Sequence, residues 1–162
     1  MHFALVARLL ILLTVANGAP LLAKAILGTR FDRALDGGAM FPDGRPWLGP
    51  AKTIRGAAVA LLATALAAPL MGLQWEVGAL VGAGAIAGDL FSSFTKRRLG
   101  LASSSMAIGL DQIPESLFPL LASRILLPLG WLDILLGVAV FFVGELVLSR
   151  ILFRLKLRDT PY

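Results

Sequence analysis

The chain has 162 residues, of which 57% are hydrophobic and 15% are charged, and its formal net charge is +5. A soluble domain of this size needs far less apolar sequence to fill its core, so the composition excludes an ordinary soluble fold. There is no cysteine and the single histidine is His2, which excludes disulfides, thiolate metal sites and the usual histidine-ligated zinc or iron sites. Oxygen ligands remain, and these favour a hard cation such as Mg²⁺.

Five apolar stretches are long enough, or nearly long enough, to cross a hydrocarbon layer, which takes about 20 helical residues. They cover residues 3–27, 54–73, 77–94, 113–129 and 132–153. Lipid offers no partners to backbone groups, so each stretch is expected to be a helix. The sequence therefore predicts an all-α integral membrane protein, a bundle of five transmembrane helices that forms one domain over residues 1–162. No basic region precedes the first stretch, so we do not expect it to be a cleaved signal peptide.

Positive charge separates the connections between these stretches into two sets. Residues 24–55, the run Lys96-Arg97-Arg98 and the tail with Arg154, Lys156 and Arg158 are basic, whereas the connections near 74–76 and 130–131 contain no lysine or arginine. The positive-inside rule places the basic set in the cytoplasm, with the N-terminus outside and the C-terminus inside the cell membrane. We interpret the net charge as this asymmetry and as attraction to anionic membrane lipids, not as nucleic-acid binding.

The first connection, residues 28–53, is the only long polar segment and is expected to be a functional cytoplasmic loop. The turn Asp43-Gly44 exposes backbone N–H groups, and Arg45, Lys52 and Arg55 add cations beside it, a combination that suits a polyphosphate. A basic loop held against anionic headgroups is the alternative. A Walker-type phosphate loop is excluded, because Ala51 stands where that motif has glycine.

Thr53 is expected to cap the second helix. The free N–H groups at that helix N-terminus, with Lys52 and Arg55 beside them, would then be able to receive phosphate.

The stretch 88–112 contains two acidic residues, Asp89 and Asp111, near the cytoplasmic ends of apolar segments and on either side of one loop. On a helix Asp89, Ser93 and Lys96 share one face. Carboxylates near hydrocarbon need a partner, which is either a structural salt-bridge cluster with Lys96 and Arg97 or a Mg²⁺ site beside a phosphate.

Two polar residues of the first stretch, Asn17 and Lys24, are seven positions apart and so lie on one face that leads to the cytoplasmic surface. Asn17 serves either this face or a hydrogen bond between helices.

The residues resemble the membrane CTP:phosphatidate cytidylyltransferases, and more closely their short five-helix branch, the CDP-archaeol synthase family. The resemblance covers nearly the whole chain through elements in one order: Asn17-Gly18-Ala19-Pro20, Asp36-Gly37-Gly38, Asp43-Gly44-Arg45-Pro46, Lys52-Thr53, Arg55-Gly56, Gly88-Asp89, Ser93, Lys96-Arg97-Arg98 and Leu110-Asp111-Gln112. It implies an integral membrane enzyme that transfers CMP from CTP to a lipid phosphate, with Mg²⁺, and releases pyrophosphate. In the archaeal branch the acceptor is a geranylgeranyl glycerol-ether phosphate.

One position departs from the family pattern. An acidic residue is expected two places after Gln112, whereas this chain has Pro114 there and an acid only at Glu115. The sequence therefore leaves two acceptors open, the archaeal ether phosphate and a related lipid phosphate of a bacterial relative.

The resemblance and the residue chemistry together suggest a role for each part of the site. Asp89 and Asp111 would hold Mg²⁺ and, with Lys96 and Arg97, form the catalytic set; Asn17, Lys24 and Ser93 would meet the lipid phosphate. The expected nucleotide-binding set is Asp43, Gly44, Arg45, Lys52, Thr53 and Arg55.

Two rival functions fit the sequence less well. A CDP-alcohol phosphotransferase requires a longer aspartate-rich helix motif, which Asp43-Gly44-Arg45 does not continue. A small transporter or scaffold without activity would be expected to show internal repeats, and the five stretches show none. The glycines Gly82, Gly84 and Gly88 permit close packing within one bundle or between two chains, which leaves a homodimer open.

Overall fold

The computed structural model describes residues 1–103 and 105–154, and within them the chain forms five α-helices. These are α1 (Phe3–Leu27), α2 (Ile54–Leu70), α3 (Trp75–Arg98), α4 (Gln112–Ser123) and α5 (Trp131–Arg154). The predicted all-helical architecture with five helices is confirmed. Lys156 and Arg158 of the predicted basic tail lie outside the described residues.

Three of the helices are long and apolar enough to cross a membrane: α1, α3 and the part of α5 from Trp131 to Ile151. Helix α2 has 17 residues and α4 has 12. At a rise of about 1.5 Å per residue α4 extends only about 18 Å, less than the roughly 30 Å of a hydrocarbon core. A multi-pass membrane protein is therefore supported, and α4 is shorter than the predicted stretch 113–129.

The early end of α4 has a local cause. In a continuous helix Pro128 would have no N–H to donate to the carbonyl of Arg124, and its ring would clash with that carbonyl. From Arg124 onwards the chain makes turns, in which the N–H of Ile125 donates to the carbonyl of Ala122 and that of Leu126 to the carbonyl of Ser123. The apolar pattern continues through these turns, so hydropathy alone does not reveal where the helix stops.

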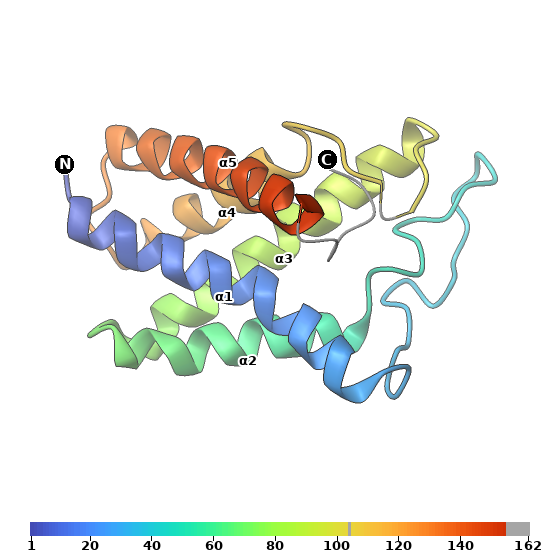
Figure 1. Cartoon of the computed structure of the whole chain (residues 1–162), viewed down its shortest axis with the longest axis horizontal. Helices are drawn as coiled ribbons and strands as arrows, with labels where there is room; N and C mark the ends of the chain where they lie inside the picture. The colour runs from blue at the N-terminus through green and yellow to red at the C-terminus, as the bar shows by residue number, and fades with distance from the viewer. Residues whose placement is uncertain (104, 155–162) are drawn as a thin grey trace.

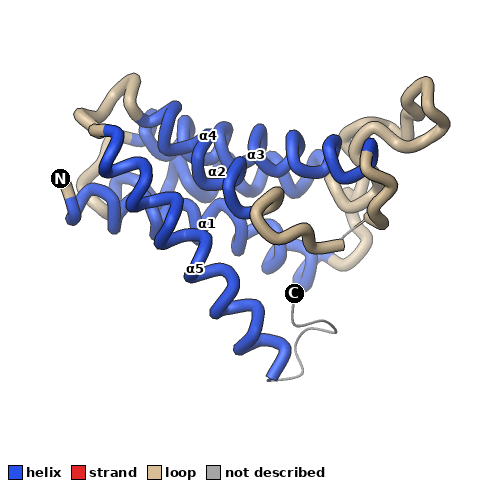
Figure 2. The backbone as a smooth tube through the Cα atoms, turned by 90° about the horizontal axis from the view of Figure 1, so that it is seen from above, coloured by secondary structure: helices blue, strands red, loops and turns tan. Residues whose placement is uncertain are grey.

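The helices run alternately up and down the bundle, with α3 packed against α1, α2 and α4 (Figure 1). The N-terminus, the α2–α3 turn and the α4–α5 connection lie at one end, and the two long loops lie at the other (Figure 1). Figure 2 shows that the second half of α5 diverges from the other helices. The grouping of the two polar loops at one end is what positions the site.

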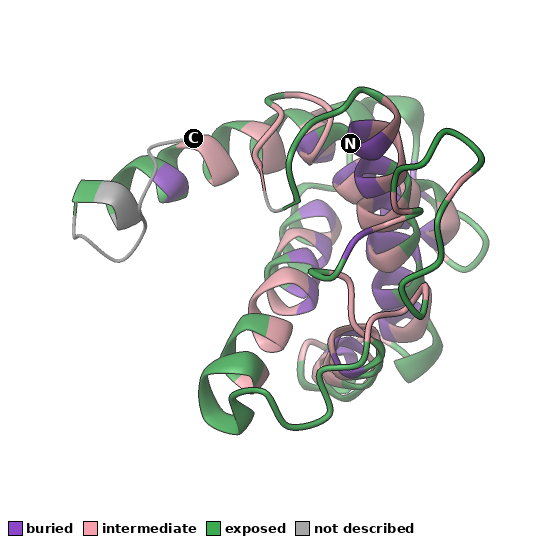
Figure 3. Cartoon of the chain, turned by 90° about the vertical axis from the view of Figure 1, so that its right-hand side faces the viewer, coloured by how far each residue is buried: buried purple, intermediate pink, exposed green. Residues whose placement is uncertain are grey.

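The core lies between α1, α3 and α4. Buried residues of α1 recur as Leu9, Leu12, Leu13 and Ala16, the spacing of a single helix face. They pack with Val77, Val81 and Ala85 of α3 and with Leu120 of α4. Figure 3 shows these buried faces turned toward the inside of the bundle, while the outward faces are exposed. The exposed faces carry large apolar side chains, as a lipid-facing surface requires: Ile11, Leu62, Leu66, Leu135 and Val143.

The glycines of α3 are used for contacts within the chain. A Cβ on Gly82 would lie 2.3 Å from Thr64 Oγ1 of α2, and one on Gly88 would lie 2.2 Å from the carbonyl oxygen of Pro114 in α4. These positions therefore serve close helix crossings inside one bundle, and a homodimer gains no support from them.

Candidate active site

A cavity of about 620 Å³ opens at the end of the bundle that carries the two long loops, and residues from all five helices and both loops line it. The sequence-predicted site residues in its lining are Asn17, Lys24, Lys52, Thr53, Arg55, Asp89, Ser93, Lys96, Arg97 and Asp111. The turn Asp43-Gly44-Arg45 is not part of this lining. Residues far apart in the sequence thus meet where the motif order predicted a single site.

Asp89 lies on α3 and forms an ion pair with Lys52, which closes the first loop just before α2. Lys52 Nζ lies 2.5 Å from Asp89 Oδ1, and the two side chains are 23% and 32% exposed. Both groups face the cavity and remain open to a ligand. This pair joins α3 to the first loop across 37 positions of sequence.

Asp111 precedes α4 and forms the second ion pair, with Lys96 of α3. Lys96 Nζ lies 2.6 Å from Asp111 Oδ1 and donates to the carbonyl of Ser105 at 2.8 Å. The other carboxylate oxygen of Asp111 accepts a hydrogen bond from the N–H of Ala107 at 2.8 Å. The second loop is thereby held against the end of α3.

The predicted common face of Asp89, Ser93 and Lys96 is present, since all three side chains line the cavity. Asp89 and Lys96 do not pair with each other along the helix. Lys96 forms its ion pair with Asp111, and Asp89 forms its ion pair with Lys52. Seven residues along a helix correspond to about 10 Å, which is too far for a direct ion pair, so each group finds a partner on a neighbouring segment.

Thr53 and Arg55 begin α2 and have structural partners of their own. Thr53 Oγ1 accepts a hydrogen bond from the N–H of Gly56 at 3.1 Å, which confirms the predicted helix cap. The Arg55 guanidinium is buried and donates to the carbonyls of Gly28 and Arg30 and to Asp32, the last at 3.1 Å. It therefore ties the start of α2 to the chain that leaves α1.

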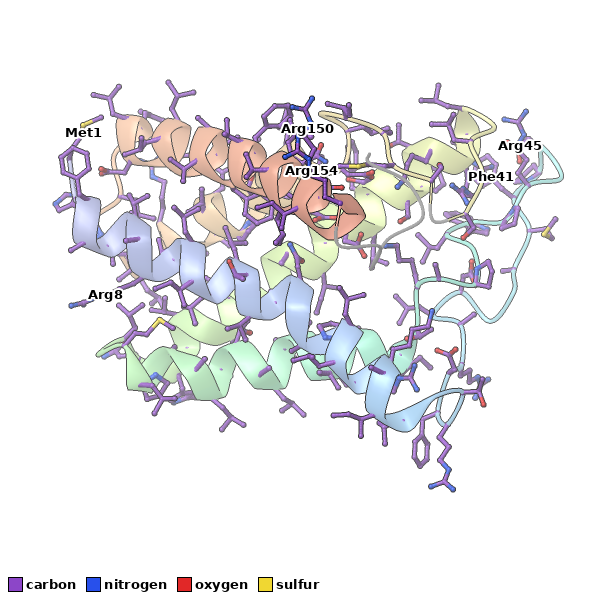
Figure 4. The ribbon with its side chains drawn as sticks, viewed as in Figure 1. Met1, Arg8, Phe41, Arg45, Arg150 and Arg154 are labelled. Carbon is purple, nitrogen blue, oxygen red and sulfur yellow. The ribbon has the colours of Figure 1, made fainter. Side chains whose placement is uncertain are left out.

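The predicted nucleotide-binding turn Asp43-Gly44-Arg45 lies on the tip of the first loop and docks on the end of α3 (Figure 4). Arg45 Nη1 donates to the carbonyl of Arg98 at 2.7 Å, and Arg98 Nη1 donates to Asp43 Oδ1 at 2.7 Å. The Arg98 guanidinium also lies 4.3 Å from the ring centroid of Phe41. We call Asp43, Arg45 and Arg98 the α3 clasp; in this structure it holds the loop and does not face the cavity.

Asp36 organises the same loop between the clasp and Lys52. Its carboxylate accepts hydrogen bonds from the N–H groups of Gly38, Leu48 and Gly49 at 3.0, 2.9 and 3.1 Å. Partial burial raises the pKa of the Asp36 carboxyl, but these backbone hydrogen bonds lower it more, so the pKa lies below its ordinary value of 3.8.

With this geometry in view, comparisons with known proteins decide the family. A family model described as CarS-like, CDP-archaeol synthase, matches residues 73–162. The CDP-archaeol synthase of Sulfurisphaera tokodaii is 34% identical over 154 residues, which cover 91% of this chain and 89% of that protein. The chain belongs to the CDP-archaeol synthase family. The predicted membership, and with it the predicted nucleotidyltransferase class, is confirmed.

Further similarities agree with this family membership. The CDP-archaeol synthase of Methanopyrus kandleri is 36% identical over 140 residues, covering 80% of each chain. A solved structure of an intramembrane enzyme for archaeal membrane lipids biosynthesis superposes with a TM-score of 0.76 at 30% identity, covering 88% of this chain and 90% of that one. Family membership decides against the transporter and scaffold alternatives.

The residues predicted to hold a hard cation lie in the cavity of this CDP-archaeol synthase family member. Asp89 and Asp111 are oxygen donors on one cavity, and each already contacts a cationic ammonium group. Within the described residues no group of three or more histidine, cysteine or acidic side chains forms a complete metal site. An ion there would take its remaining ligands from phosphate oxygens and water, as Mg²⁺ commonly does.

Two acids in the cavity were not assigned to the site from sequence: Glu115 of α4 and Glu145 of α5. Glu115 Oε2 accepts a hydrogen bond from Asn17 Nδ2 at 3.4 Å, and its carboxyl group also interacts with that of Asp89. Glu115 follows Asp111 by four positions, so helical periodicity was the signal that places both near one face. Lys24 also lines the cavity, on the exposed last turn of α1.

Proposed function

We propose that this protein is a membrane-embedded CTP-dependent cytidylyltransferase that transfers CMP to an archaeal glycerol-ether lipid phosphate, giving a CDP-lipid and pyrophosphate. The observation that carries the proposal is one cavity lined by both ion pairs, Asp89–Lys52 and Asp111–Lys96, in a chain of the CDP-archaeol synthase family.

The reaction is a substitution at the α-phosphorus of CTP. An oxygen of the lipid phosphate forms the new P–O bond, while the bond from that phosphorus to the oxygen bridging to the β-phosphate breaks and pyrophosphate leaves. A phosphate nucleophile is already ionised and needs no general base. A cavity lined by lysines, arginines and carboxylates is sufficient for such a step.

Lys52, Lys96 and Arg97 would neutralise the triphosphate and the leaving pyrophosphate, because they are the basic groups beside the two aspartates. Asp89 and Asp111 would hold Mg²⁺, which when bound stabilises charge that develops on the phosphate oxygens. Asn17 and Lys24 of α1 and Ser93 of α3 would meet the lipid phosphate. The α3 clasp would support the nucleotide pocket by holding the first loop in place.

A test of this site is transfer of labelled CMP from CTP to lipid by protein purified in detergent with Mg²⁺. We expect Asp89→Asn and Asp111→Asn each to lower kcat by at least about 100-fold, since each removes a carboxylate that acts on the transferring phosphate. Glu76→Gln is the control, because Glu76 is exposed at the opposite end of α3. Full activity in either aspartate variant would contradict the assignment.

We also propose that the five helices make five crossings, with the N-terminus outside and the active site in the cytoplasm. Support comes from the basic loops, which lie together at one end of the bundle (Figure 1). Because the chain has no cysteine, a single introduced cysteine reports the side of the membrane. A membrane-impermeant maleimide added to intact cells should label Gln74→Cys and not Ala102→Cys; the reverse pattern would invert the topology.

A further inference from the structure

The two aspartates of the cavity are each neutralised by one lysine, and the two lysines come from different segments. Lys52 closes the first loop and Lys96 lies in the last turns of α3. The four groups together carry no formal net charge. The carboxylates retain access to the cavity, with Asp89 32% and Asp111 13% exposed.

A divalent cation alone, or a triphosphate alone, would disturb this charge balance. A divalent cation at the carboxylates would sit beside two ammonium groups that have lost their partners, and like charges at such short range repel strongly. A triphosphate at the lysines would leave two partly buried carboxylates without their ammonium partners, with the Arg97 guanidinium as a basic group beside Asp111. Both ligands together restore a partner to every one of the four side chains.

We infer that Lys52 and Lys96 are exchangeable partners: they hold Asp89 and Asp111 in the free site and pass to phosphate oxygens when a divalent cation takes the carboxylates. This inference rests on the proposed function and adds a mechanism of coupled binding to it. The nucleotide and the cation each bind weakly alone and strengthen one another, and by linkage the coupling is equal in both directions.

If the lysines exchange partners, replacing one of them should change the affinity of the site for a divalent cation. Removing one lysine frees an aspartate in advance, so the cation no longer has to displace an ammonium group. The affinity for a divalent cation alone should therefore rise in the lysine variant, although the affinity for the nucleotide falls. A structural pair that the cation does not displace predicts no larger gain than the general loss of one nearby positive charge, which Lys24→Met also causes.

The experiment is a titration of the purified protein in detergent with Mn²⁺, a paramagnetic probe whose free form is measured by electron paramagnetic resonance, in the absence of nucleotide. We expect Lys52→Met and Lys96→Met to lower the Kd for Mn²⁺ by about tenfold, within the usual range of coupling between sites. Lys24→Met is the matched control, because Lys24 lines the same cavity and, in the described part of the chain, forms no ion pair with either aspartate. The gain should disappear when Asp89→Asn is added to Lys52→Met.

A second series of titrations adds the non-reactive α,β-methylene analogue of CTP. The Mn²⁺ that binds to free analogue is measured separately and subtracted. In the wild-type protein the analogue should tighten Mn²⁺ binding about tenfold or more, and in Lys52→Met this enhancement should shrink. Unchanged or weaker Mn²⁺ binding in folded Lys52→Met and Lys96→Met overturns the inference, as does a wild-type protein that binds the analogue without any change in its Mn²⁺ affinity. If instead neither the wild type nor any variant binds the analogue while the lysine variants still gain Mn²⁺ affinity, the proposed function fails and the exchange of lysine for cation stands. If Lys52→Met does not fold, Lys52→Gln and Lys96→Met carry the same comparison.

Discussion

Asp36 shows how one side chain shapes the first loop. Its carboxylate receives three backbone N–H groups, and Gly49, one of the donors, has a φ of +93° that favours glycine. A Cβ at Gly49 would also lie 3.1 Å from Ser103 Oγ of the second loop. Asp36 thus fixes the segment that leads into Lys52 and brings the two loops into contact.

This arrangement predicts a pH dependence of loop order. The pKa of Asp36 is lower in the folded loop than in an open one, so its stabilisation is complete above about pH 4 and is lost as pH falls through the folded value. At pH 7, Asp36→Ala should speed hydrogen exchange at the amides of Leu48 and Gly49 about fivefold, from the loss of roughly 1 kcal/mol of hydrogen bonding. Exchange protection measured at pH 7 and at pH 3 checks this.

Asp36→Asn keeps an oxygen acceptor and loses the charge, so it should fall between the wild type and Asp36→Ala. A difference between the wild type and Asp36→Ala that stays the same at pH 3 would show that the carboxylate charge does not hold this loop.

The sequence predicted which residues share a helix face better than it predicted which residues pair. Helical periodicity placed Asp89, Ser93 and Lys96 on one face, which the cavity confirms. It did not reveal that Lys52 pairs with Asp89, because that contact depends on how the first loop folds back over 37 positions. The clasp was missed for the same reason, since the sequence around Asp43 reads equally as a phosphate-binding turn.

Among the elements, the contact of α3 with α4 positions Asp89 relative to Asp111. Gly84 and Gly88 leave room for the backbone of α4: a Cβ on Gly84 would lie 2.5 Å from Pro119 Cα. The two helices therefore approach more closely than side chains would permit.

Gly88→Ala should separate these helices and destabilise the protein by about 1–3 kcal/mol, as overpacking in a closely packed contact does. Gly18→Ala on α1 is the matched control, because a Cβ there meets no atom within 4 Å. It should be neutral or stabilising by up to about 1 kcal/mol, owing to the better helix propensity of alanine. Unfolding free energies from titration with sodium dodecyl sulfate compare the two. Equal changes in unfolding free energy for both substitutions would mean that the α3–α4 contact accommodates the added methyl group without destabilisation.

The helix boundaries differ in how well the local sequence predicts them. The start of α2 followed from the cap at Thr53, a local signal that the structure bears out. The end of α4 did not, because the apolar residues that follow Ser123 match a membrane stretch while the chain turns before Pro128. Composition predicts which segments avoid water, and local backbone preferences decide which of them remain helical.

In the whole molecule, the candidate active site and the structural contacts lie at opposite ends of the helix bundle. The end with the two long loops carries the cavity, and the far end carries structural contacts, such as Asp133, which accepts a hydrogen bond from the backbone N–H of His2 at 2.7 Å. Arg8 lies toward that far end, away from Phe41 and Arg45 of the loop (Figure 4). The sequence predicted this division from charge, because the basic connections are those that surround the cavity.

Cytidylyltransferase activity is tested by transfer of labelled CMP from CTP by the wild-type protein in detergent with Mg²⁺, offered an archaeal glycerol-ether phosphate and phosphatidic acid in parallel. We expect labelled CDP-lipid and an equal amount of pyrophosphate, with the ether phosphate as the preferred acceptor. Labelled product from phosphatidic acid alone would correct the acceptor and retain the chemistry. No labelled lipid from either acceptor, in protein that is folded, would contradict the central claim.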